Sequence, residues 1–88
     1  MAYKIQVLET ATRELRKLDP QHRRRILEFL DERLAKLDDP RSAGGPLHGP
    51  ELGKFWKYRV GDYRLIAKIE DDRLLVLVLR VGHRKEVY

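Results

Sequence analysis

Hydrophobic and polar residues alternate with a period of two over residues 3–8, which is typical of a strand buried on one face. The period then lengthens. Ala11, Leu15 and Leu18 recur at helical spacing behind Thr10, a residue type that caps helix N-termini. The first part of the chain therefore predicts a strand followed by a helix that runs to about residue 19.

A second helix is predicted to start at Asp19-Pro20, because Asp caps helices and Pro in the first helical position loses no hydrogen bond. The break between the two helices is short, so we expect them to form an antiparallel hairpin. One apolar stripe marks the buried side of the second helix, and it consists of Ile26, Phe29, Leu30, Leu34 and Leu37.

Residues 38–54 contain four of the six glycines and three of the four prolines, which predicts a loop. A loop of this length in a small domain is often functional. The period then returns to two, and residues 55–60, 63–70 and 73–81 are predicted as strands. They are separated by Gly61-Asp62 and Asp71-Asp72, both interpreted as two-residue turns. The predicted fold is α+β, in the order β-α-α-β-β-β, with a helical hairpin packed on an antiparallel sheet.

The composition of the chain indicates its size, its kind of partner and the chemistry that it lacks. The 88 residues allow one small domain, residues 1–88, and they carry 19 Lys and Arg against 14 Asp and Glu. The net charge of +5 points to an anionic partner, either nucleic acid or an acidic protein segment. The absence of cysteine excludes disulfides and thiolate chemistry. Without a signal peptide or a membrane-spanning run, the chain is expected to be soluble and cytoplasmic, with no membrane partner.

The positive charge is concentrated in the second half of the chain. Residues 1–53 carry ten basic and nine acidic groups, and residues 54–88 carry nine and five. If Gly61-Asp62 closes a two-residue hairpin, Arg59 lies opposite Arg64. Side-chain alternation then places four basic residues on one face of the sheet, namely Lys57, Arg59, Arg64 and Lys68. An exposed strand face is often basic for solubility alone, but two opposed arginines repel unless an anion lies between them, so we favour a functional cluster.

Residues 74–79 are apolar at every position, which predicts an inner strand that needs cover on both faces. The helices can cover one face. For the other, two interpretations stay open: a partner chain, or partial cover by the loop and the tail.

The remaining polar residues show no catalytic pattern of their own. The three histidines lack metal-ligand spacing, and the carboxylates lie in turns, so no metal site and no cofactor are expected. His83 carries more weight than the other two because it adjoins Arg84 near the basic face. The pair Gly44-Gly45 is interpreted as loop composition only.

Two segments resemble the RelE toxin family: WKYRVGDYRLI at residues 56–66 and VGHRKEVY at residues 81–88. The resemblance covers nearly the whole chain. The Gly-Asp-Tyr-Arg part is shared with the wider RelE/ParE superfamily, and the ending is more characteristic of the ribonuclease branch. The resemblance implies the toxin of a toxin–antitoxin pair that cuts mRNA in the ribosomal A site without a metal ion. In the chemistry that the resemblance implies, the ribose 2′-hydroxyl attacks the adjacent phosphate and leaves a 2′,3′-cyclic phosphate.

By residue, the resemblance maps a catalytic lysine onto Lys57, a phosphate-clamping arginine onto Arg64, an acid arginine onto Arg84 and a tail tyrosine onto Tyr88. Lys57 and Tyr88 both stay open as the general base. The other basic positions near this set are expected to bind RNA or phosphate, and they are Arg59, Lys68 and His83.

The expected partners are a RelB-like antitoxin, acidic and amphipathic, and the ribosome with mRNA in its A site; DNA would be contacted only indirectly, through the antitoxin. Two alternatives remain. One is a ParE-like toxin, which has the same fold but inhibits DNA gyrase by binding. The other is a basic RNA- or ribosome-binding module without catalysis.

Overall fold

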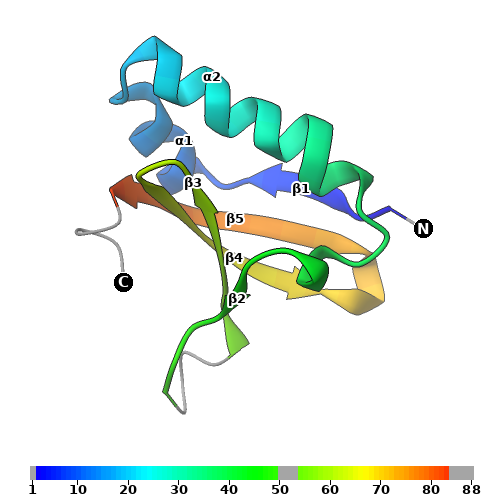
Figure 1. Ribbon diagram of the computed structural model, residues 1–88. Coiled ribbons are helices and arrows are strands. Elements are labelled where there is room, and N and C mark those ends of the chain that lie inside the picture. Colours follow the sequence, from blue (N-terminus) through cyan, green and yellow to red (C-terminus); the bar gives the residue numbers. More distant parts are fainter. Residues whose placement is uncertain (1, 50–53, 84–88) are drawn as a thin grey trace.

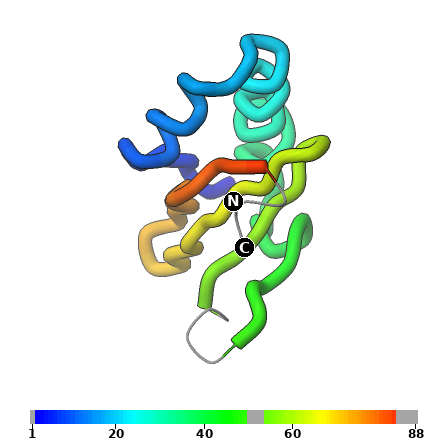
Figure 2. Tube along the Cα trace, turned by 90° about the vertical axis from the view of Figure 1, so that its left-hand side faces the viewer, coloured from blue at the N-terminus to red at the C-terminus, as the bar shows by residue number. Residues whose placement is uncertain are grey.

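The computed structural model describes residues 2–49 and 54–83. A five-stranded sheet in the order β1-β5-β4-β3-β2 carries two helices on one face (Figure 1). The view along the sheet in Figure 2 shows both helices on the same side of the strands. This confirms the α+β class and the helical hairpin on a sheet.

The first strand, β1 (Lys4–Val7), leads directly into α1 (Glu9–Arg16). The N-cap is Leu8, whose carbonyl oxygen accepts the Thr12 amide at 2.9 Å, so the predicted cap at Thr10 is wrong. The helix also ends at Arg16 rather than at residue 19. Asp19 precedes a proline and adopts an extended backbone, which the helix cannot continue into.

The second helix, α2 (Pro20–Glu28), begins at the predicted proline. It continues as one π-helical turn over Phe29–Arg33 and one 3₁₀ turn over Leu34–Lys36. Ile26, Leu30 and Leu34 are buried, as the apolar stripe predicts.

The glycine- and proline-rich segment contains structure that its composition does not reveal. A 3₁₀ turn covers Pro40–Ser42, and β2 (Gly45–Pro46) pairs antiparallel with β3 (Trp56–Val60). The sheet therefore has five strands instead of the predicted four. A two-residue strand is too short to show any hydrophobic period, and it is held by its neighbour rather than by its own sequence.

The hairpin between β3 and β4 (Tyr63–Glu70) has the predicted register, with Val60 opposite Tyr63 and Arg59 opposite Arg64. Gly61 has a positive φ of 59°, whereas the φ of Asp62 is not positive. This pattern fits a type II′ turn, which favours glycine in its first central position.

The connection from β4 to β5 (Leu75–His83) differs from the predicted Asp71-Asp72 turn. A 3₁₀ turn over Asp71–Arg73 is followed by Leu74 in the left-handed region, so four residues join the strands. Strand β5 therefore begins two residues later than predicted and extends two residues further. A bulge where Ile66 and Ala67 meet β5 leaves one extra residue on that strand.

Strand β5 lies inside the sheet, as its apolar sequence predicts, with β4 on one side and β1 on the other. Its pairing with β1 is parallel, so the sheet is mixed rather than wholly antiparallel. The main core lies between this sheet and the helices and includes Ala11, Leu15, Tyr58, Leu65, Val76 and Val78.

Candidate functional site

The face of β3 and β4 that points away from the helices carries the basic residues. Tyr58, Leu65 and Ala67 are buried in the main core, so their neighbours Lys57, Arg59 and Arg64 lie on the other face. This confirms the predicted division of the two strands into an apolar and a basic face.

These three basic residues, Lys57, Arg59 and Arg64, line one hollow of about 250 Å³, and the backbone of Gly44 and Gly45 lines it too. Lys57 and Arg64 are partly buried there, and Arg59 is exposed. None of the described residues that line the hollow is acidic. Such a cavity suits a phosphate group, because fixed cations stabilise its charge and arginine can bind two of its oxygens at once.

Gly44 and Gly45 form one wall of the hollow, which the sequence analysis missed by interpreting them as loop composition. Gly44 has a φ of 71°, and a Cβ atom on it would collide with the carbonyl oxygen of Lys57. Only glycine allows this close approach of the loop to β3. Two adjacent glycines a dozen residues before a basic strand were the available signal.

Two aromatic side chains of β3 hold the loop in this position. The Trp56 indole Nε1 donates a hydrogen bond to the carbonyl oxygen of Ala43 at 2.7 Å. The buried Tyr58 hydroxyl donates to the carbonyl oxygen of Pro40 at 2.8 Å, and burial raises the pKa of this phenol well above its usual range. Both rings are thus fixed on the side of β3 opposite Lys57 and Arg59.

The loop is also tied to the turn after β4. Arg41 donates two hydrogen bonds to the Asp71 carboxylate, at 2.8 and 3.0 Å, and the Tyr3 hydroxyl donates a third at 2.6 Å. The bonds from Arg41 and then from Tyr3 lower the pKa of Asp71 to about 2. This network, which we call the Arg41–Asp71 clamp, links the first strand, the loop and the β4–β5 connection.

Two further predicted RNA-binding residues lie apart from the hollow. Lys68 is exposed on the same face, opposite Leu77 of β5, but it does not line the cavity. His83 pairs with Tyr63, whereas Gly82 pairs with Arg64, so His83 lies on the helix side of the sheet. There the Tyr63 ring contacts both His83, at 5.8 Å between centroids, and His22, at 5.0 Å.

The other two predicted catalytic residues, Arg84 and Tyr88, lie outside the described residues. The strand that leads to them is anchored by α1. Glu14 accepts hydrogen bonds from the Arg80 guanidinium, at 3.0 Å at the shortest, and from the Val81 amide at 2.8 Å. Partial burial acts to raise the pKa of Glu14, but these hydrogen bonds outweigh it and the pKa is lowered.

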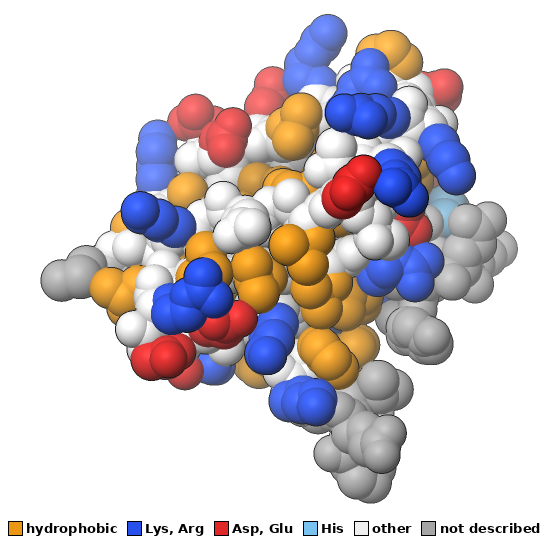
Figure 3. All heavy atoms as spheres, turned by 180° about the vertical axis from the view of Figure 1, so that it is seen from behind, with side chains coloured by type: hydrophobic (Ala, Val, Ile, Leu, Met, Phe, Trp, Pro, Cys, Tyr) orange, Lys and Arg blue, Asp and Glu red, His pale blue; other side chains and the backbone are white. Residues whose placement is uncertain are grey.

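The outer face of the sheet is partly covered by the chain itself. Leu47 from the loop packs on Ile66 and Phe55 in a small second cluster, while Leu77 and Leu79 stay half-buried. Figure 3 shows hydrophobic side chains gathered in the middle of the molecule seen from behind, with Lys and Arg around them. The loop therefore covers part of β4 on this face, and the half-buried Leu77 and Leu79 of β5 form an apolar strip beside Lys68.

The part of the chain that the structure describes contains neither a metal-binding cluster nor a membrane-spanning helix. Within residues 2–49 and 54–83, no group of three or more His, Asp or Glu side chains is placed to hold a metal ion. No helix in this part of the chain is long and apolar enough to cross a membrane.

This chain, with two helices on one face of a mixed five-stranded sheet, is similar to known toxins in both sequence and fold. The model of the family described as "ParE toxin of type II toxin-antitoxin system, parDE" matches residues 5–88. The chain is 36% identical to toxin RelG of Mycobacterium tuberculosis over 88 residues, which cover all of this chain and 98% of that toxin. It is also 36% identical to the mRNA interferase toxin RelE of Escherichia coli, covering all of this chain and 92% of RelE.

The fold agrees with these relatives. The toxin–antitoxin complex RelBE2 of Mycobacterium tuberculosis superposes with a TM-score of 0.85 and 35% identity over 98% of this chain and 95% of the matched one. The chain therefore belongs to the RelE/ParE family of toxins from type II toxin–antitoxin systems.

Proposed function

We propose that this toxin is a ribosome-dependent endoribonuclease that cleaves mRNA in the A site. The observation that carries the proposal is the hollow lined by Lys57, Arg59 and Arg64, with no acidic residue among its described lining. The similarity to an mRNA interferase over the full chain supports the same class of substrate. A ribosomal target would place the protein in the cytoplasm.

The chemistry that we propose is an internal transesterification. The 2′ oxygen of the ribose forms a bond to phosphorus while the bond from phosphorus to the 5′ oxygen breaks. The 2′ proton passes to a base, for which Lys57 and Tyr88 are the candidates, and the departing 5′ oxygen takes a proton from Arg84, the acid that the family resemblance implies. Arg64 holds the non-bridging oxygens as negative charge develops on them, which is often the largest single contribution to such a rate. This scheme needs no metal ion or cofactor, because the side chains supply both the charge and the proton transfer.

The remaining basic residues serve the path of the RNA in this proposal. Arg59 is exposed at the rim of the hollow, and Lys68 lies further along the same face. We assign both residues to phosphates outside the cleaved bond, and such contacts add affinity but no sequence information. His83 lies on the other face, so a role in RNA binding requires the RNA or the tail to reach around the edge of the sheet.

We further propose a RelB-like antitoxin as the cognate partner, which would contact DNA on the toxin's behalf. The matched complex of Mycobacterium tuberculosis is a toxin bound to its antitoxin. On this chain, the half-buried Leu77 and Leu79 beside Lys68 suit an amphipathic, acidic segment. Such a segment would bury the apolar strip and neutralise the basic face at the same time.

The test of the nuclease is primer extension on a reporter mRNA with purified ribosomes and the full-length chain. Discrete cuts within translated codons, absent without ribosomes, are expected for the wild type. Arg64→Ala and Lys57→Ala should each reduce the cleavage rate about 10²-fold or more. Arg13→Ala removes one positive charge from an exposed position on α1, away from the hollow, and should leave cleavage unchanged.

Ribosome binding, measured with the same variants, separates catalysis from binding alone. A large loss of cleavage with binding retained supports the enzyme. If binding falls in proportion to the effect and no wild-type cuts appear, the chain is a binding module instead.

The second candidate is inhibition of DNA gyrase by binding, as in a ParE-like toxin. The observation that favours it is the description of the matched family model, which names ParE. Growth arrest with intact mRNA and a gyrase-dependent DNA-damage response would establish this function and overturn the ribonuclease.

A further inference from the structure

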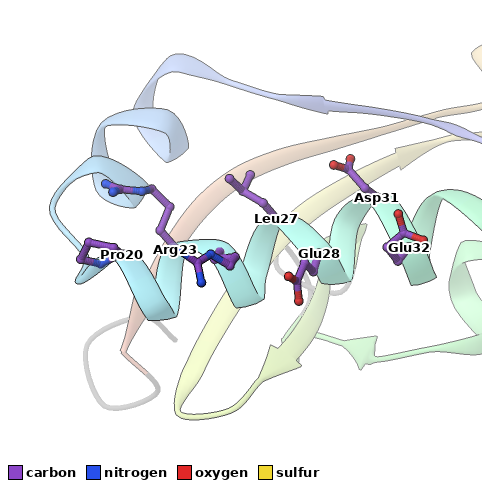
Figure 4. A pocket seen from close by; sticks show the side chains of 7 residues that line it. Pro20, Arg23, Leu27, Glu28, Asp31 and Glu32 are labelled. Carbon is purple, nitrogen blue, oxygen red and sulfur yellow. The ribbon is translucent and has the colours of Figure 1, made fainter.

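The solvent side of α2 carries a stripe of side chains that the toxin site does not use. Arg23, Arg24, Leu27, Glu28, Asp31 and Glu32 line a shallow hollow of about 330 Å³ along the helix and its π-helical extension (Figure 4). The buried residues Ile26 and Leu30 lie between these positions in the sequence and, together with Leu34, pack in the main core. Leu27 is 40% exposed and is the one large hydrophobic residue that the structure describes as exposed.

Charge along this stripe is sorted by sign. The two arginines lie near the start of the helix and the three acids lie beyond Leu27. This order opposes the helix dipole, which favours anions near the N-terminus, and the first turn contains no acidic residue. Helix stability therefore does not explain the arrangement.

The arginines of the stripe are not paired with its acids, although Arg23 donates one hydrogen bond to the carbonyl oxygen of Arg16 at 3.5 Å. In the described part of the chain, no ion pair joins Arg23 or Arg24 to an acid of the stripe. Glu32 bonds to Lys36 at 2.9 Å, and both side chains are largely exposed. Arg24 also precedes Glu28 by four residues, which is the less favourable orientation for a pair on one helix.

We propose that the α2 stripe is a self-complementary surface on which a second copy of this chain docks with its own α2 antiparallel. The stripe consists of two i, i+4 rows, Arg23-Leu27-Asp31 and Arg24-Glu28-Glu32. A two-fold axis that passes between Leu27 and Glu28 brings each row against the same row of the second helix. Arg23 then lies opposite Asp31 of the partner subunit, and Arg24 lies opposite Glu32 of the partner subunit. The symmetry repeats both pairs, so four ion pairs form around the two Leu27 side chains.

The proposed surface leaves the basic hollow free. The helices lie on one face of the sheet and Lys57, Arg59 and Arg64 lie on the other, so a pair of copies would present two open hollows directed away from the contact. Because each exposed ion pair is weak and the apolar contribution is small, the contact is expected to be transient and sensitive to salt. The proposal does not depend on what the hollow binds.

Charge reversal tests this pairing in the full-length chain. Sedimentation equilibrium of the wild type should show a monomer–dimer equilibrium at about 50 mM salt that weakens at about 500 mM. Arg23→Glu/Arg24→Glu and Asp31→Arg/Glu32→Arg should each weaken self-association about tenfold or more, because each places like charges opposite one another. Lys4→Glu/Arg13→Glu changes the net charge equally at exposed positions of β1 and α1 and should leave self-association unchanged.

A mixture of the two charge-reversed variants tests the proposed pairing most directly. An equimolar mixture of the two reversed variants should form a heterodimer of at least wild-type affinity, since every pair is then complementary. The chain that carries all four reversals should dimerise again on its own, and formation of the heterodimer also shows that both double variants fold. Three results would overturn the proposal: a monomeric wild type, self-association unaffected by reversal, or variants that lose only the binding of an antitoxin.

Discussion

A single glycine determines how closely the loop approaches the strand that carries Lys57. Gly44 combines a left-handed backbone with a position where any side chain meets β3, whereas Gly45, its neighbour, has open space where a Cβ would be. The two glycines therefore differ sharply in what a methyl group costs, although both line the same hollow.

Gly44→Ala is expected to lower the free energy of unfolding by at least about 1–3 kcal/mol, from backbone strain together with the collision at Lys57. Gly45→Ala is the matched control and should stay within about 1 kcal/mol of the wild type. Urea unfolding followed by Trp56 fluorescence measures both. Equal effects of the two substitutions would show that the loop does not depend on the close approach at Gly44.

The basic residues of the hollow could be predicted from the sequence, but the two glycines that form its wall could not. Lys57, Arg59 and Arg64 follow from a hairpin register that one Gly-Asp turn fixes, because each residue's face is then determined by counting. The position of Gly44 depends on hydrogen bonds from Trp56 and Tyr58 to carbonyl groups more than ten residues earlier. No local pattern records such contacts.

At the scale of elements, predictions succeeded where a residue pattern is long and failed where the chain is held by its neighbours. The start of α2 and the β3–β4 hairpin have strong local signals, and the structure confirms both. Strand β2, the π-helical turn and the bulge in β5 have no such signal. The continuous apolar run at residues 74–79 identifies an inner strand, but it gives no sign of the bulge, which shifts the pairing with β4 by one residue.

The Arg41–Asp71 clamp makes the contact between the loop and the β4–β5 connection depend on pH. The pKa of Asp71 is about 2 in the folded protein, below the ordinary value of about 3.9 for Asp. The stabilising contribution of the clamp is therefore complete above about pH 4 and is lost as the pH falls towards 2.

Carboxyl NMR titration is expected to give a pKa of about 2 for Asp71 in the wild type and a clearly higher value in Arg41→Ala, towards that of free Asp. In Asp71→Asn, the acid-dependent loss of stability between pH 4 and 2 should be smaller than in the wild type. The same Asp71 pKa in Arg41→Ala as in the wild type would contradict this prediction.

For the whole molecule, the charge distribution determines how binding should respond to salt. The net charge of the chain is +5, and most of the excess lies in the half that forms the basic face. Neutralising a nucleic-acid phosphate releases counterions, so affinity falls as the salt concentration rises.

Ribosome affinity measured over a series of salt concentrations should therefore give a straight line of log K against log salt. Arg59→Ala is expected to reduce the slope by about one, because one phosphate contact is lost. Arg73→Ala removes an equal charge that is paired with Glu70, at the far end of β4, and should leave the slope unchanged. An unaltered slope for Arg59→Ala would place this residue outside the path of the RNA.

The parallel pairing of β1 with β5 has a consequence for the synthesis of the protein. Lys4 is translated about seventy residues before Leu75, its partner in the sheet, so β1 stays unpaired while almost all of the chain is made. Contacts of such long sequence separation close late and slow the folding of a small domain. The sheet that supports the hollow is thus complete only after β5 has been translated, and no shorter nascent chain contains the finished hollow.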